Sequence, residues 1–136
     1  MKRCTLLEHT TDIRIKLEAS SFQDLFIIAL EGMNGLIKKK ILHSGEVIQA
    51  EIKITSPDAT ALLIDFLSEV LTLSHIKKTV FNAIFFTKLT DTTLCATISG
   101  EKIGAFDEDI KAVTYHEAYV KKNENDSYEA FVIFDI

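Results

Sequence analysis

Ile13-Arg14-Ile15-Lys16-Leu17-Glu18 is followed closely by Phe22-Gln23-Asp24-Leu25-Phe26, and the hydrophobic period changes between the two runs. In the first run apolar and charged residues alternate, which predicts a half-buried strand. From Phe22 to Ile37 apolar residues recur at helical spacing, which predicts an amphipathic helix of about four turns. Ser20 and Gln23 fit a capping box at its start.

The same change of period occurs once more along the chain. Residues 48–55 alternate as a strand would, and Ser56-Pro57-Asp58 then fits an N-cap, a proline at the first helical position and an acid favoured by the helix dipole. The helix that follows carries its apolar residues on one side. Asp65 and Glu69 are four residues apart, so they share its polar face.

The rest of the chain reads as strands joined by short turns. Before the first helix a short strand covers residues 4–7, and after the second helix we expect strands over 80–88, 92–101, 112–121 and 128–135. The region from Ile103 to Ile110 is expected to be a loop. The predicted class is therefore α+β, with two helices packed on mainly antiparallel sheets of about seven strands. Residues 1–136 form one domain, because neither a linker nor an internal repeat interrupts them.

Composition limits the function classes. Hydrophobic residues make up 47% and charged residues 26%, with a net charge of −5. An acidic chain with a pI of about 5.3 lacks the basic footprint that tight nucleic-acid binding needs. No uninterrupted apolar run reaches the roughly 20 residues of a membrane span, and no signal peptide is visible. Two cysteines, Cys4 and Cys95, are expected to be free core thiols in the cytoplasm.

The final run, Phe131-Val132-Ile133-Phe134-Asp135-Ile136, is apolar almost to its end. A docked terminal strand would hold the Asp135 carboxylate beside that of Ile136, and two close anions repel unless a cation compensates. A lysine or a hard divalent ion would serve, and Asp12 is a candidate third carboxylate. The alternative is that Asp12 is an ordinary turn acid.

Four ordered motifs resemble the archease family over essentially the whole chain. The resemblance rests on Glu8-His9-Thr10-Thr11-Asp12-Ile13, on the helix Leu62 to Leu71, on Gly100-Glu101-Lys102 followed by Lys111-Ala112-Val113-Thr114-Tyr115-His116, and on the ending in Asp135-Ile136. Thr11 stands where the family usually has alanine, and Arg14 stands where it often has glycine. A guanidinium at Arg14 would compete with a cation for the nearby carboxylates.

The resemblance implies a function. Archeases are accessory factors, not enzymes, that promote guanylylation and turnover of RtcB-type RNA ligases in tRNA splicing and RNA repair. It also implies a divalent metal site at Asp12, Asp135 and Ile136, with calcium expected and magnesium or manganese as alternatives. Lys111 corresponds to the lysine needed for activation. We assign Glu8, His9 and His116 to the same partner-facing region.

Two other functions remain open. A chaperone-like protein could steady tRNA-modifying enzymes such as an RNA methyltransferase, without dependence on Asp12 or metal. A hydrolase would require Glu8, His9 and His116 to meet in one pocket. The histidines lack zinc-ligand spacing, and surface turns explain them more simply. Asp65 with Glu69, and the acids Asp107, Glu108 and Asp109, are expected to be solvated.

Overall fold

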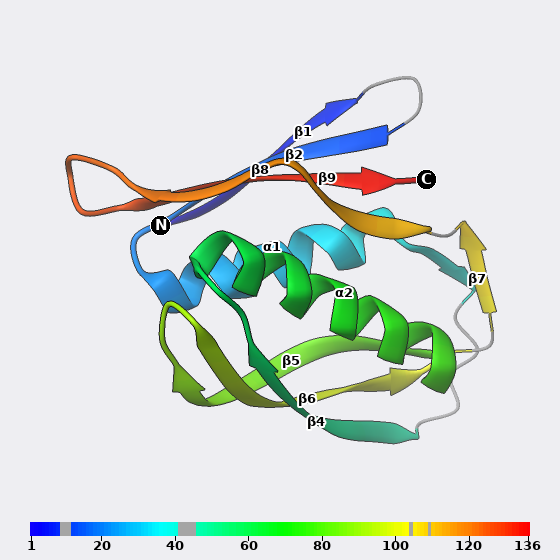
Figure 1. Ribbon diagram of the computed structural model, residues 1–136. Helices are drawn as coiled ribbons and strands as arrows, with labels where there is room; N and C mark the ends of the chain where they lie inside the picture. Colours follow the sequence, from blue (N-terminus) through cyan, green and yellow to red (C-terminus); the bar gives the residue numbers. More distant parts are fainter. Residues whose placement is uncertain (9–11, 41–45, 104, 109) are drawn as a thin grey trace.

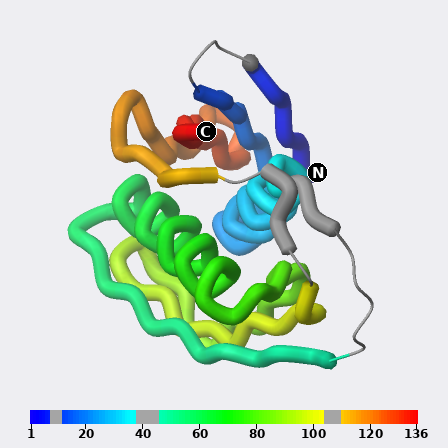
Figure 2. The backbone as a smooth tube through the Cα atoms, turned by 90° about the vertical axis from the view of Figure 1, so that its right-hand side faces the viewer, coloured from blue at the N-terminus to red at the C-terminus, as the bar shows by residue number. Residues whose placement is uncertain are grey.

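Two helices lie between two antiparallel sheets, as Figure 1 shows. The computed structural model describes residues 1–8, 12–40, 46–103, 105–108 and 110–136. Within these ranges the helices are α1 (Phe22–Leu36) and α2 (Ala59–Lys77). The view in Figure 2, turned by 90°, shows both helices in the space between the sheets. Each sheet therefore has one face toward the helices and one face turned outward.

The first sheet contains the two ends of the described chain. Its strands are β1 (Lys2–Glu8), β2 (Asp12–Ala19), β8 (Ala112–Lys122) and β9 (Tyr128–Asp135). Their order is β1-β2-β9-β8, and every pairing is antiparallel. Ile15 and Leu17 of β2 are buried, as are their partners Val132 and Ala130 on β9. The alternation in the sequence thus separates a core face from an outward face.

The second sheet has β6 at its centre. Its strands are β4 (Val47–Thr55), β5 (Thr79–Leu89) and β6 (Thr93–Lys102), in the order β4-β6-β5. A separate antiparallel pair joins β3 (Lys38–Lys40) to β7 (Ala105–Glu108). Gly100 is required where β6 pairs with β5, because a Cβ at this position would lie 1.9 Å from the carbonyl oxygen of Val80.

Aromatic and aliphatic side chains from all three layers form one core. The largest fully buried side chains include Phe26 of α1, Phe66 of α2, Phe81 of β5 and Phe134 of β9. The rings of Phe26 and Phe66 lie 5.5 Å apart between centroids and join the two helices. Burial of each ring stabilises the fold by roughly 2–3 kcal/mol relative to exposure. The two helices thus pack between the sheets and contribute side chains to one shared core.

α2 is 19 residues long with a mean hydropathy of 1.4, so by length and composition alone it could cross a membrane. The burial of α2 inside the protein also accounts for its apolar character. Eight of its residues are buried, among them Leu63, Phe66 and Leu67, because the helix packs between the two sheets. Its remaining face carries polar residues.

The α+β class and both helices are confirmed, and several details are corrected. The expected seven strands correspond to the two larger sheets. The β3–β7 pair adds two more, and β7 lies where a loop from Ile103 to Ile110 was expected. Ser21, not Ser20, caps α1 by accepting from the N–H of Asp24 at 3.1 Å. Asp58, not Ser56, caps α2 by accepting from the N–H of Ala61 at 2.8 Å.

The cysteines are free, as expected, but they are not core thiols. Cys4 is exposed at the edge of the first sheet and Cys95 is half-buried on the second. Alternation accounts for Cys95, because it lies on the outward side of β6 between buried Leu94 and Ala96.

Candidate metal and partner site

Asp12 and Asp135 are directly opposite each other in the pairing of β2 and β9. Directly paired residues of antiparallel strands project to the same face of a sheet. Here that face is the outward one, because the neighbouring pair, Ile13 and Phe134, belongs to the core face. Residues separated by 123 positions are thus brought together by strand pairing alone.

Lys111 joins this end of the sheet from β8. Its backbone N–H donates to the carbonyl oxygen of Asp135 at 2.8 Å, and Ala112 is the register partner of Asp135. Lys111 is exposed, and the exposed fraction of Ile136 is 46%. Four of the residues assigned from the sequence therefore lie at one end of the first sheet: Asp12, Lys111, Asp135 and Ile136.

The donor chemistry at this end suits a hard divalent ion. Carboxylate and carbonyl oxygens are the ligands that calcium and magnesium prefer. Asp12 and Asp135 supply two carboxylates, and Ile136 adds its carboxylate or a main-chain oxygen. Within the part of the chain that the structure describes, no three His, Cys, Asp or Glu side chains gather closely enough to hold a metal. If a divalent ion binds at this end, Ile136 would have to supply the third group.

Arg14 already neutralises one of the two carboxylates. Its Nε donates to Oδ1 of Asp12 at 3.2 Å, and its Nη1 lies 3.4 Å from Oε2 of Glu117. The side chains of Asp12 and Arg14 are 16% and 30% exposed, so this ion pair is only partly screened by water. The competition expected at Arg14 thus has a geometric basis.

Glu117 reaches Arg14 because β8 bulges. Thr114 is paired with Ile133 and Tyr119 with Phe131, so five steps along β8 face only two along β9. Glu117 has a φ of 55°, a left-handed conformation that non-glycine residues adopt rarely. No sequence pattern predicts such a bulge. Glu117 is therefore a residue of the candidate site that the sequence did not indicate.

The bulge also fastens the Lys111–His116 motif to α2. The hydroxyl of Tyr115 donates to Oδ1 of Asp65, and Ser56 donates to Oδ2 of the same carboxylate at 2.6 Å. Asp65 therefore holds two elements together and is not simply solvated. The hydrogen bond to Asp65 raises the pKa of Tyr115.

His116 and Glu8 do not form a compact site. His116 is exposed, with Nε2 at 3.9 Å from Oε2 of Glu117. Glu8 ends β1, at the opposite edge of the sheet from β8. Three strand spacings separate these edges, or about 14 Å. His9 lies outside the described residues. The separation of Glu8 from His116 gives no support to the hydrolase hypothesis.

A second polar cluster lies on the same outward face, near the start of β9. Tyr119 donates to Oε2 of Glu129 at 2.6 Å, and Lys121 and Lys16 approach the same carboxylate. The hydrogen bond from Tyr119 and the two lysines lower the pKa of Glu129, although its burial opposes this. Desolvation, together with Glu129, raises the pKa of Tyr119 to about 12. This cluster ties β2, β8 and β9 together.

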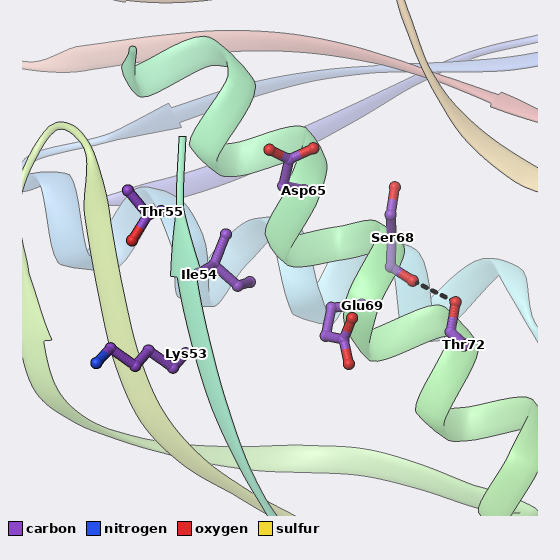
Figure 3. Close-up of a pocket in the computed structure, with 7 residues that line it drawn as sticks. All are labelled: Lys53, Ile54, Thr55, Asp65, Ser68, Glu69 and Thr72. Carbon is purple, nitrogen blue, oxygen red and sulfur yellow. Dashed lines mark hydrogen bonds between the residues drawn. The ribbon is translucent and has the colours of Figure 1, made fainter. Parts of the chain in front are cut away.

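A shallow groove of about 420 Å³ separates α2 from β4 (Figure 3). In Figure 3 Ile54 points from β4 toward α2, whereas Lys53 and Thr55 point away from it. On the helix side Thr72 donates to the carbonyl oxygen of Ser68 at 2.9 Å. The expected solvation of Glu69 is confirmed, since it is exposed beside the groove.

Two helices between antiparallel sheets place this chain among small α+β proteins, with the acidic pair Asp12 and Asp135 at one end of the first sheet. The model of the Archease protein family (MTH1598/TM1083) matches residues 5–136. Protein archease of Methanosarcina mazei is 32% identical over 143 residues, covering 99% of this chain and 97% of the relative. Protein archease of Pyrococcus abyssi is 30% identical over 145 residues and covers both chains fully. The chain belongs to the archease family.

Solved structures show the same fold. The solution structure of Methanobacterium thermoautotrophicum protein 1598 has a TM-score of 0.69 at 20% identity and covers 98% of each chain. The crystal structure of an archease from Thermotoga maritima, described as a possible chaperone, has a TM-score of 0.65 at 21% identity. That match covers 96% of this chain and 94% of the other.

Proposed function

We propose that this protein is a non-enzymatic accessory factor that activates an RtcB-type RNA ligase by promoting its guanylylation and multiple turnover. The observation that carries the proposal is the direct pairing of Asp12 with Asp135, with Lys111 hydrogen-bonded to the same Asp135. Among the residues that the family resemblance assigns to ion binding and activation, Asp12 lies in β2, Asp135 lies in β9 and Lys111 directly precedes β8. Their shared position at one sheet end supports a common role.

In this proposal Asp12, Asp135 and Ile136 hold a divalent cation, with calcium expected and magnesium or manganese as alternatives. The bound cation would supply positive charge that offsets the repulsion between the carboxylates. Lys111 contributes a second positive charge on an exposed side chain whose backbone is fixed to Asp135. The cation and Lys111 together would neutralise the three carboxylates at this end of the sheet, so the ligase would meet a surface without excess negative charge.

The partner, and not this chain, would hold the RNA. A net charge of −5 disfavours direct contact with a phosphate backbone. The proposal places the protein in the cytoplasm with its ligase. His116 and Glu8 would act as contacts at the rim of the partner surface, since they lie at opposite edges of the sheet.

The test is ligase guanylylation with and without this protein, in calcium, magnesium, manganese and chelator. We expect stimulation by the wild type, and its loss in Asp12→Asn. Asp91→Asn is the matched control, because it removes an exposed carboxylate from the β5–β6 turn of the other sheet. Equal stimulation by Asp12→Asn and Asp91→Asn would contradict the metal-site mechanism. No stimulation by the wild type in any metal would contradict ligase activation.

A second candidate is a chaperone-like modulator of tRNA-modifying enzymes such as an RNA methyltransferase. The description of the Thermotoga maritima relative as a possible chaperone favours it. Phe85 is 70% exposed on the outward face of the second sheet, and this candidate assigns client contact to it. This candidate predicts that the protein suppresses aggregation of a methyltransferase equally well as wild type and as Asp12→Asn. Phe85→Ser should weaken that protection.

A further inference from the structure

Arg14 forms a charged bridge across the first sheet, next to the proposed ion site. It extends from β2 over β9 to the bulge of β8, contacting Asp12 at 3.2 Å and Glu117 at 3.4 Å. Beneath it lies Ile133, the register partner of both Arg14 and Thr114, which is only 2% exposed although it projects to the outward face. Arg14 thus has a fixed place and two acidic partners.

The two contacts of Arg14 use different nitrogen atoms. Nε is directed to Asp12, whereas Nη1 is directed to Glu117. A guanidinium holds several donors in a rigid planar fork, so one contact can open while the other keeps the charge paired. Glu117 has a side chain 50% exposed, which leaves it room to accept more of the guanidinium.

We propose that Arg14 is a tethered competitor for the divalent ion and that Glu117 receives its guanidinium when the ion binds Asp12. Arg14 holds Asp12 when no ion is present and keeps the carboxylate neutralised. A cation that displaces it must overcome this contact and the remaining positive charge nearby. Glu117 lowers the free-energy cost of this displacement, because the displaced guanidinium stays paired with Glu117. Arg14 and Glu117 therefore set the ion affinity in opposite directions.

This inference rests on the proposed metal site and goes further, since it assigns affinity to two residues that are not ligands. It predicts a specific pattern among variants. Arg14→Met keeps an aliphatic stem over Ile133 and removes the charge. Calcium affinity should then rise by about tenfold, the order expected when a unit charge leaves the surroundings of a divalent ion in water. Glu117→Gln should lower the affinity by about threefold.

The pattern includes a double variant and a matched control. In Arg14→Met with Glu117→Gln, the effect of Glu117→Gln should be smaller than in the wild-type background, because Glu117 no longer has a displaced guanidinium to receive and keeps only its own charge effect on the ion. Arg3→Met removes the same charge from the Arg3–Glu18 pair on the same outward face. Glu18 lies six residues from Asp12 along β2, or about 20 Å, well beyond the screening length. Arg3→Met should leave calcium affinity unchanged.

The experiment is calorimetric titration of each full-length variant with calcium, and then with magnesium and manganese. Thermal unfolding of each variant checks that it is folded. In parallel, the NMR signal of the Arg14 Nε–H should shift on calcium addition, whereas that of Arg3 should not. No change in affinity for Arg14→Met, while Asp12→Asn still abolishes binding, would overturn the competitor role and leave the metal site standing. No binding of any ion by the wild type or by Arg14→Met would overturn both.

Discussion

Asp12 of β2 and Asp135 of β9 are register partners, 123 residues apart in the chain and adjacent at one end of the first sheet. Strand pairing places their side chains on the same outward face. The two acids differ in environment, because Asp12 is bound by Arg14, whereas Asp135 is exposed and held through its backbone by Lys111. The proposed function depends on this pair, and the first prediction follows from it.

Asp12→Ala, or deletion of Ile136, should abolish stimulation of ligase guanylylation while leaving the fold intact. Loss of the Asp12–Arg14 contact should lower the free energy of unfolding by no more than about 1 kcal/mol, since partly exposed ion pairs contribute little. Guanylylation assays and chemical unfolding measure the two effects separately. Stimulation at the wild-type rate by either variant would remove these residues from the mechanism.

Gly100→Ala should destabilise the protein severely. The added Cβ would lie 1.9 Å from the carbonyl oxygen of Val80, so β5 and β6 would have to separate locally. We expect a loss of about 3 kcal/mol or more, or failure to fold. Gly35→Ala in α1 is the matched control, because apart from its chain neighbours and the backbone of its own helix no atom lies within 4 Å of its Cβ position. It should stabilise the helix by about 0.5–1 kcal/mol. Similar unfolding midpoints for the two variants would refute this account.

Glu129 should make stability sensitive to acid. Its pKa in the folded protein is lowered, chiefly by the hydrogen bond from Tyr119 and also by Lys121 and Lys16. The unfolded chain therefore binds a proton more readily than the folded protein. The stabilisation is present above the ordinary pKa of about 4.3 and is lost as the pH falls through the folded value.

Glu129→Gln should accordingly weaken the loss of stability below about pH 4.3, measured by urea unfolding at a series of pH values. Glu124→Gln, in the exposed β8–β9 turn, is the control that removes an equivalent carboxyl without these partners. If both variants showed the same acid dependence as the wild type, the Glu129 cluster would have no part in acid stability.

Tyr119 should be the last tyrosine to ionise. Desolvation and its contact with Glu129 raise its pKa from 10.0 to about 12. Folding thus favours the neutral phenol, and its stabilisation is complete below pH 10 and is lost as the pH rises toward about 12. The phenolate absorbance of the folded protein should show a phase near pH 12, which Tyr119→Phe removes, besides the raised titration of Tyr115. Tyr115→Phe should leave the phase near pH 12 in place, and loss of that phase in Tyr115→Phe instead would reassign the group to Tyr115.

Local pattern was enough to predict most elements of the fold. Alternation around Ile15 and helical spacing around Phe26 reflect the two side-chain periods that the backbone geometry imposes, so strands and helices could be placed from the residues alone. The β3–β7 pair could not, because Lys38–Lys40 and Ala105–Glu108 are too short to show a period of their own and form strands only by pairing with each other.

The candidate site was predicted in part. Asp12, Asp135, Ile136 and Lys111 were all assigned from the chain's motifs, and the register brings them together. Asp65 was expected to be a solvated helix acid, but it accepts hydrogen bonds from Ser56 and Tyr115. Such contacts join residues up to 50 positions apart, which no local period encodes.

By itself, the sequence determined the α+β class, the two helices, the outward face of β2 and the acids at its end, because these follow from local periodicity and residue chemistry. Only the tertiary structure decided that Asp12 lies opposite Asp135 and that Glu117 shares Arg14 with Asp12. Register and the β8 bulge result from long-range packing of β9 between β2 and β8. The electrostatics of the site therefore arise only when the sheet has formed.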